Sequence, residues 1–202
     1  VDVISAEQFT NQAGADVSNL LRTLVPSYNV RAESISDAAT FVRPANLRGL
    51  PSDSTLVLLN GKRRHRAAVI SFLGAGLSDG AQGPDVAVIP AIALERVDVL
   101  RDGAAAQYGA DAIAGVINFV LRDDAEGGQF EVKYGSTYDG DGDNYQIAGN
   151  IGLPVTEDGF INLSFEYREA DETIRAVQRD DAAALIEAGN TAVRQPFAQT
   201  FG

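Results

Sequence analysis

Three segments in the second half of the chain alternate apolar and polar residues, and this alternation constrains the fold more than any other feature. They read QFEVKYGSTY, NYQIAGNIGL and FINLSFEYRE, at about residues 129–138, 144–153 and 160–169. Residues two apart lie on the same face of a strand, so each segment predicts a strand with one apolar and one polar face. Each is about ten residues long, the length that a tilted strand needs to cross a bilayer.

The alternation is compatible with two kinds of sheet. Seven of the 15 aromatic residues fall within residues 129–170, as is typical of outer-membrane barrel strands. A soluble antiparallel meander alternates in the same way, so periodicity alone leaves both interpretations open. Three strands cannot close a barrel, so the barrel interpretation places most of its strands beyond Gly202. In that case we expect unpaired strand edges that tend to self-associate.

The first 123 residues predict a mixed α and β domain. Val3 and Ile4 indicate a short strand, after which Ser5 caps a helix with Gln8 as its capping-box partner. Asp16 caps a second helix, which ends at Pro26. Further strands are expected at Tyr28–Arg31, Thr55–Leu59, Glu95–Leu100 and Gly115–Leu121. We therefore expect an α+β domain over 1–123, three strands within 124–170, and a long loop with a short helix over 171–202.

Charge separates the same regions. Residues 1–123 carry 11 basic and 13 acidic side chains, whereas 124–202 carry 5 basic and 15 acidic ones. Hydrophobic residues make up 45% of the chain, which is enough for a packed core. The absence of cysteine excludes disulfides and thiolate metal sites. No apolar run reaches 18 residues, and the start VDVISAEQF lacks a signal sequence, so we expect a mature chain or an excised piece.

The stretch NGKRRHR at 60–66 concentrates positive charge on an acidic chain. Four of the 16 basic residues and the only histidine fall within residues 62–66. A nucleic-acid patch is disfavoured because the domain is not basic and no aromatic residues interleave there. A solvated turn and a loop that binds an anionic ligand stay open, since clustered arginines suit carboxylate or phosphate.

Motifs for catalysis, cofactors and metals are weak. GAGLSDG at 74–80 approaches a dinucleotide fingerprint, but Gly83-Pro84 breaks the helix that such a site needs. DGDGDN at 139–144 has the alternating carboxylates of a calcium loop without its distal glutamate, and favours a hairpin turn. His65 stands alone, and no nucleophile–base pair is visible. We expect neither catalytic residues nor a bound cofactor or metal, and an NAD-type enzyme would require cofactor binding at GAGLSDG.

The segment VAVIPAIALERVDVLRDGAAAQYGADAIAGVINFVLR at 86–122 resembles the plug domain of TonB-dependent outer-membrane receptors. LRGLPSDSTLVLLNGKR, VDVISAEQF and DVSNLLRTLVPSYNV are similar to the family's other plug motifs, in the same order. The resemblance covers residues 1–123. Asp102 stands where the family's RGP turn has glycine, and Ala114 replaces the first glycine of a GG pair. Both departures suggest a subfamily.

The resemblance implies a transporter. The plug would lie inside an outer-membrane barrel of about 22 strands, with residues 124–170 as the first strands and the rest of the barrel beyond this chain. TonB would pull a Ton box upstream of Val1, and lipid would surround the barrel. The ligand would be a siderophore, vitamin or oligosaccharide, without covalent chemistry and without nucleic acid as a partner. The alternative is a stand-alone soluble ligand-binding module with a β meander.

The resemblance also assigns residues. The outward apices match Ala32–Thr40, Leu50–Asp53 and Arg63–Gly83, with 139–143 and 171–202 also outside and 154–159 a periplasmic turn. Arg48 and Arg101 match plug arginines that face barrel glutamates in relatives. Their alternative partners are Glu95 and Asp102. The residues expected to face the ligand are Ser34, Ser36, Asp37, Ser52, Asp53, Arg64, His65 and Arg66.

Overall fold

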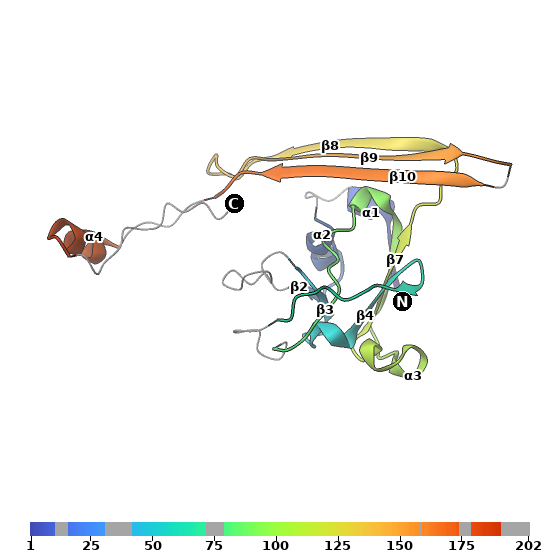
Figure 1. Cartoon of the computed structure of the whole chain (residues 1–202), viewed down its shortest axis with the longest axis horizontal. Helices are drawn as coiled ribbons and strands as arrows, with labels where there is room; N and C mark the ends of the chain where they lie inside the picture. Colours follow the sequence, from blue (N-terminus) through green and yellow to red (C-terminus); the bar gives the residue numbers. More distant parts are fainter. Residues whose placement is uncertain (11–15, 31–41, 72–78, 158, 174–178, 191–202) are drawn as a thin grey trace. The chain divides into compact units, whose positions relative to one another are not determined.

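The computed structural model describes residues 1–10, 16–30, 42–71, 79–157, 159–173 and 179–190. The main element of the first region is a five-stranded sheet in the order β1-β6-β7-β4-β5. Figure 1 labels two of its strands, β4 and β7. β4 and β7 run parallel, and the other neighbours are antiparallel. The strands are β1 (Asp2–Ser5), β4 (Thr55–Leu59), β5 (Lys62–Arg63), β6 (Leu94–Leu100) and β7 (Gly115–Leu121).

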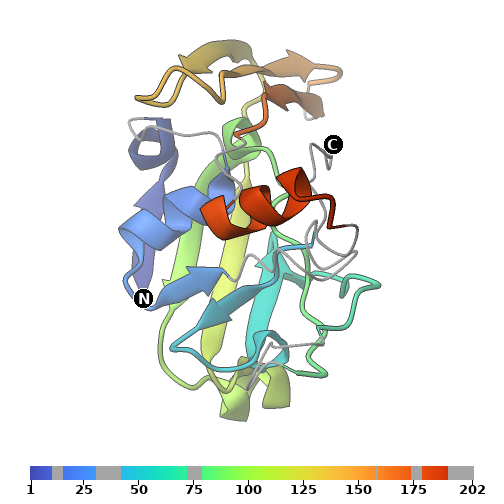
Figure 2. The same cartoon turned by 90° about the vertical axis from the view of Figure 1, so that its left-hand side faces the viewer.

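Short elements pack around this sheet. Figure 2 shows α2 and the antiparallel β2–β3 hairpin on one side of it. The helices are α1 (Ala6–Thr10), α2 (Val17–Leu24), α3 (Ala105–Tyr108) and α4 (Asp180–Glu187). The hairpin strands are β2 (Tyr28–Val30) and β3 (Ala45–Leu47). Single 3-10 turns within the described ranges include η2 (Ser52–Ser54), η4 (Ala91–Ala93) and η5 (Ala110–Ala112).

Alternation along the strands divides the buried side chains between two clusters. The larger cluster joins the sheet to α2 and to the β2–β3 hairpin, and it contains Val97, Val99, Ile117 and Phe119, each 0% exposed. The smaller cluster packs β4 and β7 against the loop that carries η5. Its buried members are Leu56, Leu58, Ala104, Ala112 and Val116. The strands of this sheet are therefore covered because other elements of the same region pack on them.

The local sequence signals near the N-terminus are confirmed. The backbone amide of Ser5 donates to Oε1 of Gln8 at 3.0 Å, as in a capping box. Asp16 accepts from the amide of Ser18 at 2.8 Å and so caps α2. The helix stops at Leu24, two residues before Pro26, whose ring could not continue it. The expected mixture of short helices and strands follows from these signals.

Residues 127–170 form the meander, a separate antiparallel sheet in the order β10-β9-β8. Its strands are β8 (Gly127–Gly135), β9 (Asn144–Pro154) and β10 (Phe160–Ala170). Their apolar side chains are exposed, as at Phe130 with 68% and Leu163 with 54%. On the opposite face Asn150 is buried, and its Nδ2 donates to Oγ of Ser164 at 2.8 Å.

The end of the first alternating segment differs most from the prediction. The first alternating segment was expected to extend to Tyr138, but β8 ends at Gly135. Beyond it the hydroxyl of Thr137 donates to the carbonyl of Asp141 at 2.8 Å. Gly140 and Gly142 have φ of 78° and 63°, which glycine adopts without steric cost. These local bonds close the connection to β9 and end the ladder earlier than periodicity indicates.

Among the helices that the structure describes, none is long and apolar enough to cross a membrane.

Candidate functional site

The basic cluster begins at a tight hairpin between β4 and β5. Asn60 and Gly61 form its two-residue turn with φ of 48° and 74°. Both values are positive, as the turn of this kind of hairpin requires, and Asn-Gly is its preferred dipeptide. The Asn60 amide donates to the carbonyl of Phe119 at 2.8 Å, and Asn60 Oδ1 accepts from the amide of Leu121 at 2.8 Å. The turn is thus fixed to the end of β7.

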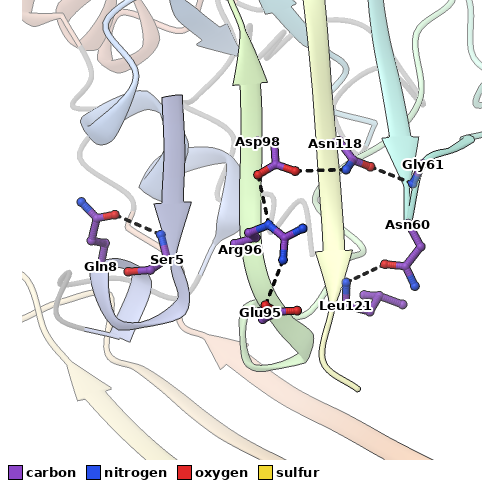
Figure 3. Close-up of polar contacts among 9 residues, drawn as sticks. All are labelled: Ser5, Gln8, Asn60, Gly61, Glu95, Arg96, Asp98, Asn118 and Leu121. Carbon is purple, nitrogen blue, oxygen red and sulfur yellow. Dashed lines mark hydrogen bonds and ion pairs between the residues drawn. The ribbon is translucent and has the colours of Figure 1, made fainter. Parts of the chain in front are cut away.

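A row of polar contacts continues from this turn across the sheet (Figure 3). The Gly61 amide donates to Oδ1 of Asn118 at 2.9 Å, and Asn118 Nδ2 donates to Asp98 Oδ2 at 3.2 Å. Nε of Arg96 donates to Asp98 Oδ1 at 3.2 Å, and its NH1 donates to Oε1 of Glu95 at 2.9 Å. The row joins β6 and β7 to the turn between β4 and β5, and it positions the chain that follows Gly61.

The chain after the hairpin lines a cleft of about 260 Å³ along the edge of β4. The Arg64 amide donates to the carbonyl of Val57 at 2.9 Å and holds this chain beside β4. Arg63 forms an ion pair with Asp111, and NH2 of Arg66 lies 3.7 Å from the same carboxylate. The lining residues are Ser52, Asp53, Thr55, Leu56, Val57, Arg63, Arg64, Arg66, Gln82, Pro84 and Asp111.

The structure brings together four of the residues expected to face a ligand. Ser52, Asp53, Arg64 and Arg66 all line this cleft. His65 does not line it and is exposed. Ser34, Ser36 and Asp37 lie outside the described residues, and so does most of GAGLSDG. The sequence interval between Ser52 and Arg64 gives no sign of this proximity, which depends on the pairing of β4 with β5.

A partly buried group of polar side chains around Tyr28 of β2 was not anticipated from the sequence. Asp16 accepts from NH1 of Arg43 in an ion pair, and Asp85 accepts from the Ala87 amide at 3.0 Å. Tyr28 is 3% exposed. Burial raises the pKa of its phenol well above the ordinary value, and the Asp16 and Asp85 carboxylates raise it further. This phenol is therefore kept protonated inside the domain.

Among the described residues, no group of three or more His, Cys, Asp or Glu side chains is placed so that it could hold a metal ion. The DGDGDN stretch instead belongs to the connection between β8 and β9. Its Asp143 carbonyl accepts from the Asp171 amide at 2.7 Å, which joins this connection to the end of β10. The hairpin interpretation of this stretch is confirmed.

Comparison with known families identifies the first region. Residues 1–116 match the family described as the TonB-dependent receptor plug domain. The chain belongs to this family. The expected α+β fold with following antiparallel strands is confirmed, because solved TonB-dependent receptors share it. The siderophore receptor PirA of Acinetobacter baumannii superposes with a TM-score of 0.65 and 25% identity, covering 84% of this chain and 24% of that one.

Curated relatives extend the similarity into the meander. The ferric enterobactin receptor of Pseudomonas aeruginosa is 27% identical over 186 residues, which cover 82% of this chain and 24% of the relative. The vitamin B12 transporter BtuB of Photobacterium profundum is 28% identical over 171 residues, covering 85% of this chain and 25% of the relative. The chain therefore spans about a quarter of the length of these relatives. The plug boundary at residue 123 and the strand region to 170 stay predictions.

The two arginines matched to plug–barrel contacts lie in different settings. Nε of Arg101 forms an ion pair with Oδ2 of Asp2 at 2.6 Å, and its NH2 donates to Oδ1 at 2.9 Å. The alternative local partners, Glu95 and Asp102, are not the carboxylate that Arg101 contacts, because β1 pairs with β6 and brings Asp2 to the end of β6, while Glu95 pairs with Arg96. Arg48 occupies a turn with φ of 59° and makes no ion pair with a described residue. Contact of either arginine with barrel glutamates stays a prediction.

Proposed function

We propose that this chain is the plug and the first barrel strands of a TonB-dependent transporter of the outer membrane. The observation that carries the proposal is the union of a plug-family domain with a meander whose apolar side chains stay exposed. In water this apolar face would remain exposed to solvent, whereas in a membrane lipid would cover it. The remaining barrel strands would follow Gly202 and enclose the plug.

The plug would close the barrel lumen until TonB, driven by the proton-motive force of the inner membrane, rearranges it. TonB would pull a Ton box upstream of Val1, so force would reach β1 first. β1 lies at the edge of the sheet and is hydrogen-bonded to β6 alone, over Asp2–Ser5. A short edge strand with one neighbour separates more readily than β6 or β7, which each have two. Detachment of β1 would also break the pair between Asp2 and Arg101.

The ligand would be a small molecule of the siderophore, vitamin or oligosaccharide class, bound without covalent chemistry. Relatives named for ferric enterobactin and for vitamin B12 support the first two classes. The ligand would meet the outward apices of the plug, where Ser34, Ser36, Asp37 and His65 are expected to contribute. Ser52, Asp53, Arg64 and Arg66 would contribute through the cleft beside β4.

Cell fractionation tests this proposal. An antibody raised against residues 1–123 would be used on outer-membrane and soluble fractions, with and without boiling before electrophoresis. We expect a band several times larger than 21.3 kDa, confined to the outer membrane and shifted by heat, as closed barrels are. A soluble band near 21.3 kDa would instead mean a small soluble module and would overturn the transport proposal.

A further inference from the structure

The turn between β4 and β5 carries a dipeptide that is chemically reactive when it is free to move. Asn60-Gly61 is the only asparagine–glycine pair in the sequence, and both residues are exposed. In such a pair the backbone nitrogen of glycine can attack the side-chain amide carbon of asparagine. Glycine has no Cβ to hinder this approach, and asparagine is among the thermolabile residues of proteins. The pair is therefore a candidate for deamidation.

The reaction would convert the side-chain amide of Asn60 into an acid. A bond forms between the Gly61 nitrogen and Cγ of Asn60, the Cγ–Nδ2 bond breaks, and ammonia leaves with the proton of the Gly61 amide. Water then opens the succinimide ring at either carbonyl carbon and leaves aspartate or isoaspartate at position 60. The reaction therefore requires a Gly61 nitrogen that can lose its proton and turn toward the asparagine side chain.

Hydrogen bonds engage both reacting groups in the folded chain. The Gly61 amide donates to Oδ1 of Asn118 at 2.9 Å, so the proton that must leave is held by an acceptor on β7. Oδ1 of Asn60 accepts from the Leu121 amide at 2.8 Å, which holds the asparagine side chain at the end of β7. Figure 3 shows both bonds, which join the two residues of the turn to different positions on that strand. Attack would require the bond of Gly61 to open first.

The acceptor for Gly61 is itself fixed by the row of polar contacts. Nδ2 of Asn118 donates to Oδ2 of Asp98 at 3.2 Å. An ionised carboxylate only accepts hydrogen bonds, so Asn118 must present its nitrogen to Asp98 and its oxygen to Gly61. Asp98 is held in turn by Nε of Arg96, which donates to its Oδ1 at 3.2 Å. The side chain of Asn118 is thus oriented before the turn forms its bond.

We propose that Asn60 is a deamidation site that the folded plug keeps unreactive, with Asn118 as the residue that protects it. The Gly61 amide must release Asn118 before its nitrogen can attack, so the folded chain reacts only through local opening of the turn. Removal of the acceptor on Asn118 would make this opening more frequent. The inference concerns the covalent chemistry of the turn, and it holds whether or not the protein transports a ligand.

Deamidation would change the hairpin and its charge. Either product places a negative charge next to Lys62 and Arg63. Isoaspartate also lengthens the backbone of the two-residue loop, and loop length determines the register of a hairpin. The pairing of β5 with β4 places Leu58 opposite Arg63 and Leu59 opposite Lys62. This short pairing would be lost from molecules that carry isoaspartate.

The test uses the complete receptor purified in detergent and incubated in mildly alkaline buffer. Samples would be digested with pepsin in acid, and mass spectrometry would follow the mass gain of the peptide that contains Asn60. The wild type would be compared with Asn118→Ala and with the wild type unfolded in urea. Ile117→Val is the matched control, because Ile117 is fully buried beside Asn118 in β7 and its truncation weakens packing without removing the acceptor of Gly61. Heat-dependent migration would verify that the variants are folded.

We expect a rapid mass gain in urea and a slow one in the folded wild type. Asn118→Ala should react roughly fivefold faster than the folded wild type, the factor that corresponds to one ordinary hydrogen bond. Asp98→Asn leaves the oxygen of Asn118 in place and only loosens its orientation, so it should accelerate the reaction less. Ile117→Val should react at the wild-type rate.

Three results would each overturn the inference. Absence of a mass gain in urea would show that the pair is not reactive. Equal rates in urea and in the folded wild type would show that the fold gives no protection, even if Asn118→Ala could not be folded. A rate in Asn118→Ala that matched the wild type, or that Ile117→Val matched, would show that the bond to Asn118 does not control the reaction.

Discussion

Strands β6 and β8 have similar alternating sequences and opposite burial. In β6, Val97 and Val99 are each 0% exposed, because α2 and the β2–β3 hairpin pack on that face. In β8, Phe130 and Val132 occupy the corresponding alternate positions and are 68% and 62% exposed. Alternation therefore determines which side chains share a face, but not what covers that face. Elements of the plug itself cover β6, whereas the apolar face of the meander stays exposed.

Removing a buried aromatic ring from the plug should have the largest effect on stability. It tests whether the strands of the plug depend on the packing that covers them. Phe119 is fully buried in β7, so Phe119→Ala should lower the free energy of unfolding of the plug by about 3–5 kcal/mol. Hydrogen exchange of peptides from β7 in the complete receptor measures this loss. Phe130→Ala is the control and should change exchange in β7 by less than about 0.5 kcal/mol. Equal effects would remove the distinction between the two regions.

A charged side chain introduced on the exposed apolar face of the meander tests what covers that face. If lipid covers this face, Leu163→Lys should cost about 2–4 kcal/mol near the bilayer midplane. The measurement is the fraction of receptor that migrates as heat-modifiable barrel after refolding into lipid vesicles. Glu157→Lys, in the exposed connection between β9 and β10, should refold like the wild type. Refolding of Leu163→Lys to the same extent would mean that water covers the face.

Alkaline pH should act on the plug through Tyr28. Burial raises the pKa of this phenol above its ordinary value of 10.0, so the folded plug keeps a proton that the unfolded chain loses. The contribution of the protonated Tyr28 phenol to the free energy of unfolding is fully present below about pH 10. It falls by about 1.4 kcal/mol per pH unit as the pH rises toward the pKa of the folded state. Tyr28→Phe should flatten this decline in urea unfolding, while Tyr138→Phe, at a fully exposed position, should not. An unchanged slope in Tyr28→Phe would contradict the assignment.

The smallest expected effect concerns the ion pair at the edge of the sheet. Asp2 and Arg101 are both close to half exposed, so Asp2→Asn should cost no more than about 1 kcal/mol of β1 stability. Arg101→Ala should cost the same if Asp2 is its sole partner, and clearly more if barrel glutamates also contact it. Hydrogen exchange of a peptide covering β1 would compare the two. Equal losses would refute the predicted plug–barrel contact of Arg101.

Much of the fold could be predicted because its signals are local. Ser5 and Gln8 mark one helix start and Asp16 another, and Asn60-Gly61 has the composition of the hairpin turn that the structure shows. The candidate site was only partly predictable. The dense positive charge at 62–66 marks Arg64 and Arg66 in the sequence, whereas no local pattern marks Asp111. The partners considered for Arg101 did not include Asp2.

The sequence by itself determined the element types, the two regions and the family resemblance, because helix caps, turn residues and strand alternation act over a few neighbouring positions. Only the tertiary structure decided which distant residues meet. It placed Ser52 and Arg64 along one cleft beside β4, buried Tyr28 near Asp16 and Asp85, and left the apolar side chains of the meander exposed. The physical reason is that burial and charge pairing depend on which strands become neighbours, and strand order is a property of the whole chain.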